Sequence, residues 1–142
     1  MQIRKMTAED VDAVARLYLS AYGVDWTEAG AARYIGRFFG FEPESCLLAI
    51  EGGGALAGAV LAYTFEKETG VTLYIQELFV RPDARHKGYG KQLVTRLRES
   101  LTKKASSVKV KPLVKADVGV LNFYNSLGFE RGKAVSFSFD ED

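Results

Sequence analysis

The sequence predicts one domain of the mixed α/β class, a β-sheet flanked by helices, and three observations lead to this class. First, segments with the apolar spacing of helices alternate with segments that have the apolar spacing of strands. Second, a length of 142 residues without repeats or an interdomain linker fits a single domain over residues 1–142. Third, a hydrophobic fraction of 47% with a net charge of +1 argues against a disordered chain and against a protein that mainly binds a polyanion such as DNA.

The elements are predicted from their apolar spacing and from the residues at their boundaries. In approximate bounds they are strand 3–5, helix 7–23, helix 27–39, strand 46–51, strand 55–65, strand 71–80, helix 88–104, strand 107–114, helix 118–127 and strand 134–139. Thr7-Ala8-Glu9-Asp10 resembles a capping box at the start of the first helix, and Gly23 ends that helix. Gly52-Gly53-Gly54 predicts a hairpin turn, and the polar segment 66–70 predicts the next turn.

The strand expected over 71–80 changes its apolar phase. Its apolar residues are Val71, Leu73 and Ile75 in odd register, then Leu78 and Val80 in even register. One extra residue near Gln76 and Glu77, a β-bulge, would return the second half to the core face. Because Phe79 is also apolar, a strand that is buried on both faces and has no bulge is the alternative.

A strand, a glycine-containing turn and a helix meet in the segment 77–90. The first turn of a helix that begins near Gly88 leaves backbone N–H groups unpaired at the positive end of the helix dipole, so a phosphate or pyrophosphate is the expected ligand. Gly88 and Gly90 allow a tight turn and close contact with phosphate oxygens, while Arg85 either shapes the loop or adds a charge. A dinucleotide-binding loop would need a third glycine where Leu93 stands, and no Gly-Lys-Ser/Thr run of a P-loop is present.

A second motif, Leu121-Asn122-Phe123-Tyr124-Asn125-Ser126-Leu127-Gly128-Phe129, predicts a short amphipathic helix. Gly128 stands where a left-handed C-terminal cap is expected. On this spacing alone, Tyr124 is predicted to be a packed core tyrosine.

Arg85-x-x-Gly88-x-Gly90 and the segment Phe123–Phe129 together resemble the two signature motifs of the GNAT superfamily of acyl-CoA-dependent N-acyltransferases. The order of elements is similar to that family over essentially the whole chain, so a GNAT fold is implied. Such a fold has a central twisted mixed sheet, a bulged fourth strand, fourth and fifth strands that splay apart, and flanking helices. The implied activity is that of an N-acetyltransferase, an acyltransferase that moves an acetyl group from acetyl-CoA to a primary amine by direct attack in a ternary complex.

The resemblance also implies which residues bind acetyl-CoA. These are Leu78, Phe79, Val80, Arg85, His86, Lys87, Gly88, Tyr89, Gly90, Lys91, Asp117 and Tyr124. The loop would hold the pyrophosphate, and main-chain groups of 78–80 would bind the acyl carbonyl and the pantetheine arm. Asp117 stands where the family commonly has Asn and can only accept hydrogen bonds when ionised, so an N-cap role is the alternative. Pro112 interrupts the fifth strand, which is compatible with the splayed opening.

Two side chains are the catalytic candidates. The resemblance implies that Tyr124 is the general acid that protonates the departing thiolate, and a phenol with a pKa of about 10 suits that task. Glu77, at the expected bulge, is the leading candidate for the base that deprotonates the amine, although a solvated or salt-bridged glutamate would fit the same position. His86 lies inside the phosphate loop, where we expect its backbone rather than its ring to matter.

The acceptor pocket is expected at the turn between the first two helices, from the resemblance. The candidates there are Tyr22, Asp25, Trp26 and Glu28, a set of aromatic and acidic side chains that suits a cationic amine of a small molecule or peptide. Helix capping and hydrophobic packing explain the same residues equally well. A monomer or a homodimer is expected.

Other classes of function have little support in the sequence. Cys46 begins an apolar run and is interpreted as a buried small hydrophobe, and no cluster with metal-ligand spacing predicts a metal. Without a signal peptide or a long apolar segment, we expect a cytoplasmic protein that does not enter a membrane. The basic residues Lys103, Lys104, Lys109, Lys111 and Lys115 are interpreted as a solvated surface rather than a nucleic-acid site. A non-catalytic acyl-CoA-binding or regulatory module is the alternative function, and a phosphate-binding fold of another family is a more distant one.

Overall fold

The structure is a computed structural model that describes residues 1–101, 104–110, 118–132 and 137–140. The chain divides into two compact units, Met1–Lys111 and Pro112–Asp142. The larger unit contains the sheet and three α-helices, and the smaller unit contains the fourth. The single domain expected over 1–142 therefore stays a prediction.

The elements follow the expected order. They are β1 (Gln2–Lys5), η1 (Ala8–Asp10), α1 (Val11–Tyr22), α2 (Glu28–Phe41), η2 (Pro43–Ser45), β2 (Cys46–Ile50), β3 (Leu56–Lys67), β4 (Gly70–Val80), η3 (Pro82–Ala84), α3 (Tyr89–Ser100), β5 (Ser107–Val110) and α4 (Val118–Ser126), where η marks a short 3-10 helix. Every helix and strand predicted before Gly128 is present, and their boundaries differ by a few residues.

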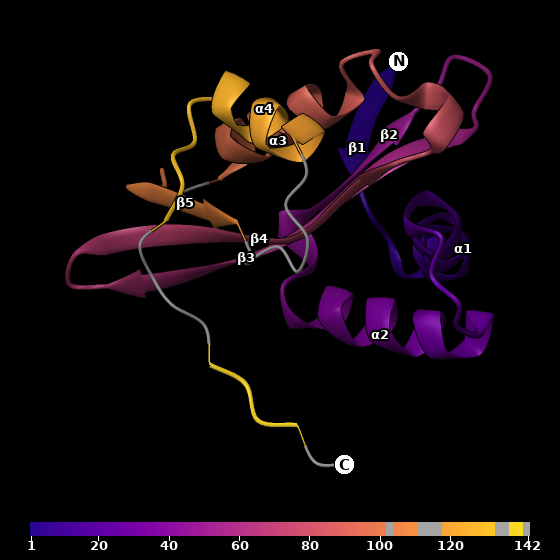
Figure 1. Cartoon of the computed structure of the whole chain (residues 1–142), viewed down its shortest axis with the longest axis horizontal. Helices are drawn as coiled ribbons and strands as arrows, with labels where there is room; N and C mark the ends of the chain where they lie inside the picture. Colours follow the sequence, from indigo (N-terminus) through magenta and orange to yellow (C-terminus); the bar gives the residue numbers. More distant parts are fainter. Residues whose placement is uncertain (102–103, 111–117, 133–136, 141–142) are drawn as a thin grey trace. The chain divides into compact units, whose positions relative to one another are not determined.

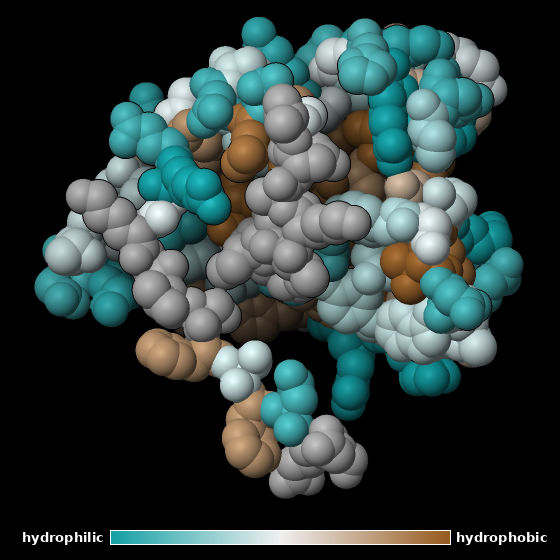
Figure 2. Space-filling view, in the orientation of Figure 1, coloured by the Kyte–Doolittle hydropathy of each residue, from teal (hydrophilic) through white to brown (hydrophobic). Residues whose placement is uncertain are grey.

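The strands of the larger unit form one mixed sheet in the order β1-β2-β3-β4-β5. Neighbouring strands from β1 to β4 are antiparallel, and β5 runs parallel to β4. Figure 1 shows α1 and α2 on one side of this sheet and α3 on the other. Hydrophilic residues predominate on the viewed surface (Figure 2), because the apolar faces of helices and strands turn toward each other.

Apolar side chains fill the space on both sides of the sheet. Val14 of α1 and Ile35 of α2 pack with Leu48 and Leu61 of the strands, and all four are buried. On the opposite side, α3 buries its predicted apolar stripe, including Leu93. Helices therefore cover both faces of the sheet, although Phe65 of β3 stays exposed on the face toward α2.

Cys46 is buried at the start of β2, as predicted. Burial raises the pKa of its thiol to about 11. The thiolate that a cysteine nucleophile needs is therefore scarce at neutral pH, and Cys46 is a packing residue.

Local sequence signals set the ends of α1 and α2. Gly23 ends α1 in the left-handed conformation at φ 63°, as the sequence predicts. The Thr27 hydroxyl accepts a hydrogen bond of 2.9 Å from the Gly30 N–H and so caps the start of α2. The turn between the two helices is therefore short and fixed at both ends.

β4 contains the bulge that its change of apolar phase predicts. Leu61 of β3 pairs with Glu77, whereas the next residue Ala62 pairs with Ile75. Gln76 is thus one extra residue on β4. Its position agrees with the prediction from sequence.

Beyond the bulge, β4 packs apolar side chains on both of its faces. Val80 stays on the face toward α3, because a Cβ on its partner Gly58 would contact both the Val80 side chain and Leu93 of α3. Phe79 is buried on the opposite face among residues of α1 and α2. The alternative of a strand without a bulge is therefore wrong, although its second half does place apolar residues on both faces.

The structure corrects some predicted boundaries. The helix expected to reach Lys104 ends at Ser100, whose hydroxyl donates to the Leu97 carbonyl at 2.9 Å, and Leu101 is already extended. Residues 111–114 of the predicted fifth strand lie outside the described residues, and so do Pro112 and Asp117. Of the last predicted strand, 134–136 also lie outside them, and 137–140 form no strand, because alternation alone supplies no partner for the backbone ladder.

The smaller unit contains α4, and its end matches the prediction. Gly128 has a φ of 90° and its N–H donates to the Asn125 carbonyl, while the Phe129 N–H donates to the Tyr124 carbonyl, both at 3.0 Å. This pair of bonds is a Schellman motif. The rings of Tyr124 and Phe129 meet edge to face with centroids 5.5 Å apart, which adds the hydrophobic contact that often accompanies the motif.

The ion pair between Arg4 and Asp10 generates a prediction about stability. The Arg4 guanidinium donates to both oxygens of Asp10 at 2.8 and 2.9 Å, and the Thr7 N–H donates to the same carboxylate at 2.8 Å. Hydrogen bonding to Arg4 lowers the pKa of Asp10 below its usual range. Replacement of Asp10 by Asn should reduce the free energy of unfolding at pH 7 by about 1–2 kcal/mol, measured by urea denaturation.

Because the pKa of Asp10 is lowered in the folded state, its stabilisation is complete well above the unfolded pKa of about 3.9 and is lost as the pH falls below it. The difference between wild type and Asp10→Asn should therefore shrink progressively below pH 4. Asp12→Asn, an exposed change in the first turn of α1, is the matched control. A difference that stayed constant from pH 7 to pH 2 would contradict the assignment.

Candidate functional site

Among the described residues, the second half of β4 is paired on one side only and forms an open sheet edge. The pairing of β4 with the described part of β5 ends at Ile75 opposite Val110, immediately before the bulge. β4 continues to Val80 in its pairing with β3, without another partner in the described ranges. This geometry fits strands that diverge, as expected, although the residues after Val110 lie outside the described part.

Side-chain contacts show which backbone groups face that open edge. The Leu78 carbonyl accepts from the Tyr22 hydroxyl at 3.1 Å, and the Val80 carbonyl accepts from Nε of Arg85 at 3.4 Å. In a regular antiparallel pair, the N–H and C=O of one residue point to the same side of the strand. The N–H groups of Leu78 and Val80 therefore point away from β3, whereas Phe79 directs its backbone groups toward β3.

Glu77 is held at the bulge by two phenols. The Tyr34 hydroxyl donates to one carboxylate oxygen at 2.6 Å, and the Tyr22 hydroxyl lies 3.2 Å from the other. The Gln76 amide donates to the Tyr34 hydroxyl at 3.3 Å, so both residues of the bulge reach the same phenol. A carboxylate has about four acceptor positions, which leaves lone pairs of Glu77 available to a ligand.

Two phenols near Glu77, those of Tyr34 and Tyr18, have raised pKa values and remain protonated. Burial, followed by the hydrogen bond to Glu77, raises the pKa of the Tyr34 hydroxyl far above its ordinary value. Burial, followed by the charge of Glu77, also raises the pKa of Tyr18. The rings of Tyr18, Tyr22, Tyr34 and Phe79 contact one another with centroids 5.3–5.7 Å apart. Glu77 is therefore fixed by an aromatic cluster that joins α1, α2 and β4.

The loop that follows β4 ends in a bare helix N-terminus. Gly88 is the N-cap of α3 in the left-handed conformation at φ 86° and supplies no side-chain cap, so the first-turn N–H groups are not capped by it. His86 also has a positive φ of 65°, which is uncommon for a non-glycine residue. Lys87 and Lys91 are exposed at the same helix end, where cations oppose the helix dipole unless an anion is present.

Two arginines fix this loop to its surroundings. Arg85 donates through Nη2 to the Ala21 carbonyl at 2.6 Å, near the C-terminal end of α1. Arg81 pairs with Glu51 and with Asp83, and its Nη1 donates to the Leu56 carbonyl at 3.1 Å. Both guanidiniums thus donate to acceptors of the protein itself, and the role of Arg85 toward a phosphate stays a prediction.

Tyr124 lies in α4, in the smaller unit, where its ring also contacts Phe123 with centroids 5.0 Å apart. Asp117, the remaining predicted cofactor residue, lies outside the described residues. The assignments of both residues remain predictions.

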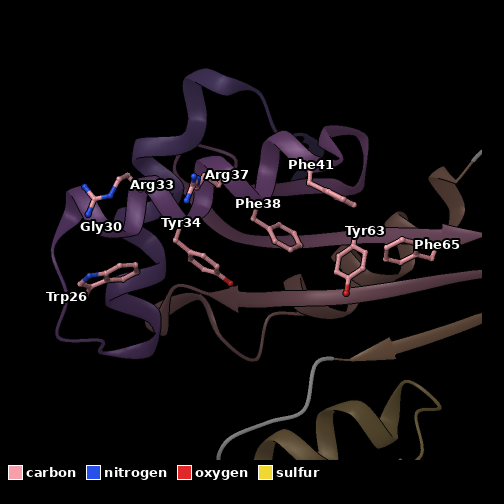
Figure 3. Close-up of a pocket in the computed structure, with 9 residues that line it drawn as sticks. All are labelled: Trp26, Gly30, Arg33, Tyr34, Arg37, Phe38, Phe41, Tyr63 and Phe65. Carbon is pink, nitrogen blue, oxygen red and sulfur yellow. The ribbon is translucent and has the colours of Figure 1, made fainter. Parts of the chain in front are cut away.

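A pocket of about 650 Å³ lies along α2. It is lined by Trp26, Gly30, Arg33, Tyr34, Arg37, Phe38, Phe41, Tyr63 and Phe65. Figure 3 shows Trp26 near one end, Tyr34 in the middle with its hydroxyl toward the strands, and Phe41 with Phe65 near the other end. Tyr34 lines the pocket and its hydroxyl donates to Glu77. This single hydrogen bond therefore connects the pocket lining to the bulge.

Sequence reasoning identified only part of this pocket. Of the predicted acceptor residues, Trp26 lines it and Tyr22 contacts Glu77, whereas Asp25 and Glu28 are exposed outside its lining. Of the lining, residues 30, 33, 34, 37, 38 and 41 share one face of α2, whereas Trp26 precedes the helix, and this spacing is the signal of the pocket in the sequence.

Neither metal chemistry nor a membrane span is supported by the described residues. In those ranges, no group of three or more His, Cys, Asp or Glu side chains is arranged to hold a metal ion. No described helix combines the length and the apolar character needed to cross a bilayer.

Comparison with known proteins places this site in a family. Residues 11–129 match the acetyltransferase (GNAT) family. An uncharacterised N-acetyltransferase of Methanocaldococcus jannaschii is 28% identical over 140 residues, which cover 94% of this chain and 62% of that protein. The chain thus spans about three-fifths of the length of that relative.

Solved structures share the fold along the whole chain. A probable acetyltransferase has a TM-score of 0.81 at 18% identity and is covered over 100% of both chains. A ribosomal-protein-alanine N-acetyltransferase from Brucella melitensis biovar Abortus 2308 has a TM-score of 0.77 at 18% identity, covering 99% of this chain and 100% of the other. An aminoglycoside N-acetyltransferase in complex with CoA has a TM-score of 0.78 at 16% identity, covering 99% of this chain and 95% of the other. With a family match over most of its residues and the fold shared with solved acetyltransferases, this chain belongs to the acetyltransferase (GNAT) family.

Proposed function

We propose that this chain is an N-acetyltransferase that uses acetyl-CoA and transfers the acetyl group directly to a primary amine. The observation that carries the proposal is the bulge at Gln76, because it puts the Glu77 carboxylate next to the outward-facing N–H groups of Leu78 and Val80. A base and an oxyanion-binding edge are thereby adjacent on one strand, a few residues before an anion-binding loop.

The cofactor would be bound by backbone groups of the loop and of the strand. The uncapped first turn of α3 suits the pyrophosphate, with Lys87 and Lys91 adding positive charge. The acyl carbonyl would accept from the N–H groups of Leu78 and Val80, which become more favourable donors as the oxygen gains negative charge. Our assignment of acetyl-CoA agrees with the family and with the CoA complex of the aminoglycoside N-acetyltransferase.

The chemical step needs one base and one acid. Glu77 would take a proton from the ammonium form of the acceptor, and the free amine would attack the thioester carbon. As the C–N bond forms, the carbonyl electrons move to oxygen, and their return breaks the C–S bond. The attached nitrogen, which is positively charged in this intermediate, would lose its second proton to solvent as the amide forms. Tyr124 would give its proton to the coenzyme A thiolate and would be reprotonated from solvent, so that the products are a neutral amide and a thiol.

Replacement of Glu77 by Gln tests the base. We expect kcat/KM for the amine to fall about 100-fold, because Gln retains the shape but accepts no proton, while acetyl-CoA affinity stays unchanged. The measurement is acetyl-CoA-dependent thiol release across a panel of amines, polyamines and peptides, with calorimetry for acetyl-CoA. Glu9→Gln, an exposed change in η1, is the control. Unchanged turnover in Glu77→Gln would remove Glu77 from the mechanism.

Replacement of Tyr124 by Phe tests the acid. We expect kcat to fall about 10- to 100-fold with little change in the KM for acetyl-CoA, because the thiolate would have to leave unprotonated. Tyr74→Phe removes a phenol elsewhere in the chain and should leave kcat unchanged. Full activity in Tyr124→Phe would reject the acid assignment alone. Acetyl-CoA binding by wild type without turnover on any amine would instead favour a non-catalytic module.

Deletion of Gln76 tests the bulge itself. Without Gln76, Ile75 and Glu77 become consecutive residues that pair with Ala62 and Leu61. The ladder is then regular, and every residue after the deletion stays on its present face of the sheet. We therefore expect a folded protein with a Tm within several degrees of wild type but with turnover reduced at least 10-fold, because the open edge is straightened.

The control for this deletion is Gln76→Ala, which keeps the extra residue and loses only the hydrogen bond to Tyr34. Thermal unfolding and thiol release are measured on both variants. A deletion variant as active as Gln76→Ala would show that the bulge is dispensable for the reaction.

A further inference from the structure

The lining of the pocket along α2 suits a ligand with an apolar part. Its lining is mostly aromatic, and its volume of about 650 Å³ lies within the range of small-molecule sites. Phe41 and Phe65 are 61% and 52% exposed although they contact each other with centroids 6.5 Å apart. Large aromatic side chains that stay this exposed at a pocket wall leave apolar area that a ligand can cover.

At the other end of the pocket, the Trp26 indole packs against Gly30, a residue without a side chain. A Cβ on Gly30 would lie 2.5–2.8 Å from three atoms of the Trp26 indole, so the ring rests directly on the backbone of α2. Figure 3 places Trp26 and Gly30 together at this end of the pocket. The indole is therefore part of the wall, and a methyl group at position 30 would displace it.

The charged side chains that line the pocket are all positive. Arg33 and Arg37 are the charged residues of the lining, and no acidic side chain of the described part of the chain belongs to it. Neither guanidinium forms an ion pair with a described residue. The two arginines stand four residues apart on one helix face, where like charges repel, and a bound anion would relieve that repulsion.

The pocket also leads to the proposed reaction centre. Tyr34 stands between the two arginines in sequence, lines the pocket, and donates at 2.6 Å to the Glu77 carboxylate. A ligand along α2 would thus meet a positively charged wall on the helix and a negatively charged group at the bulge. An anion on the side of the helix and an amine on the side of the bulge match that polarity.

We propose that the acceptor is an amine with an aromatic or apolar body and an anionic group, which Arg33 and Arg37 bind while its amine faces Glu77. This inference rests on the proposed function, because it names the acceptor class of that same site. Paired guanidiniums suit a carboxylate or a phosphate. Polycationic amines such as aminoglycosides are disfavoured by the same charges, although structural relatives include aminoglycoside acetyltransferases.

The chain contains a reporter for this pocket, because Trp26 is its single tryptophan. Binding is followed by Trp26 emission, excited where phenylalanine does not absorb, and needs neither acetyl-CoA nor turnover. The probes are phenylalanine and phenylalanyl-phenylalanine, each compared with its C-terminal amide, which keeps the amine and the rings but lacks the anion. Kanamycin is the polycationic probe.

We expect a saturable change of emission with both acids, at least 10-fold weaker binding of the amides, and no response to kanamycin. The double variant Arg33→Gln/Arg37→Gln should lose at least 10-fold in affinity for the acids and leave the amides unchanged. Arg16→Gln/Arg98→Gln removes two exposed arginines elsewhere and should bind as wild type. Gly30→Ala should shift the emission of the free protein and weaken all the aromatic probes.

Several outcomes would overturn the inference. These are equal binding of acids and amides by wild type, equal losses for both in the double arginine variant, or no saturable response to either acid. Thiol release from acetyl-CoA is measured in parallel on the same amines. Turnover with a preference for cationic amines would reject the acceptor class and keep the transferase, whereas acid-selective binding without turnover on any amine would reject the transferase alone.

Discussion

The extra residue at Gln76 is the constraint on which the rest of the site depends. In a regular strand, Glu77 would share the face of Ile75 and point toward α3, and the apolar residues after it would exchange faces. The bulge instead turns Glu77 toward α1 and α2, where Tyr22 and Tyr34 bind it. One insertion therefore places a carboxylate among phenols while the buried faces of β4 stay apolar.

The aromatic cluster around Glu77 also couples the cofactor loop to the acceptor pocket. Tyr22 stands at the last turn of α1, next to Ala21, whose carbonyl accepts from Arg85 of the loop. Tyr34 stands on α2 and forms part of the pocket wall. A shift of either helix would move the phenols, the base and the loop together, so the elements that would meet the two substrates are mechanically linked.

The fold was largely predictable because it follows from local patterns, whereas the pocket depends on contacts between distant segments. The phase change between Ile75 and Leu78 identified the bulge, and glycine positions identified the ends of α1 and α4. The face of α2 that carries Arg33 and Arg37 could not be assigned in the same way. Its aromatic residues are as suitable for a core as for a pocket, and only the position of β3 leaves them partly uncovered.

An open strand edge normally invites another strand, and side chains oppose that outcome here. An added strand needs both the donors and the acceptors of the edge, because the two chains exchange N–H and C=O bonds. The carbonyls of Leu78 and Val80 already accept from Tyr22 and Arg85, so this edge offers mainly donors. A ligand with an acceptor oxygen and no matching donor, such as a thioester carbonyl, satisfies that edge better than a peptide strand does. The contacts that hold the loop and Glu77 in place therefore also select what the edge can bind.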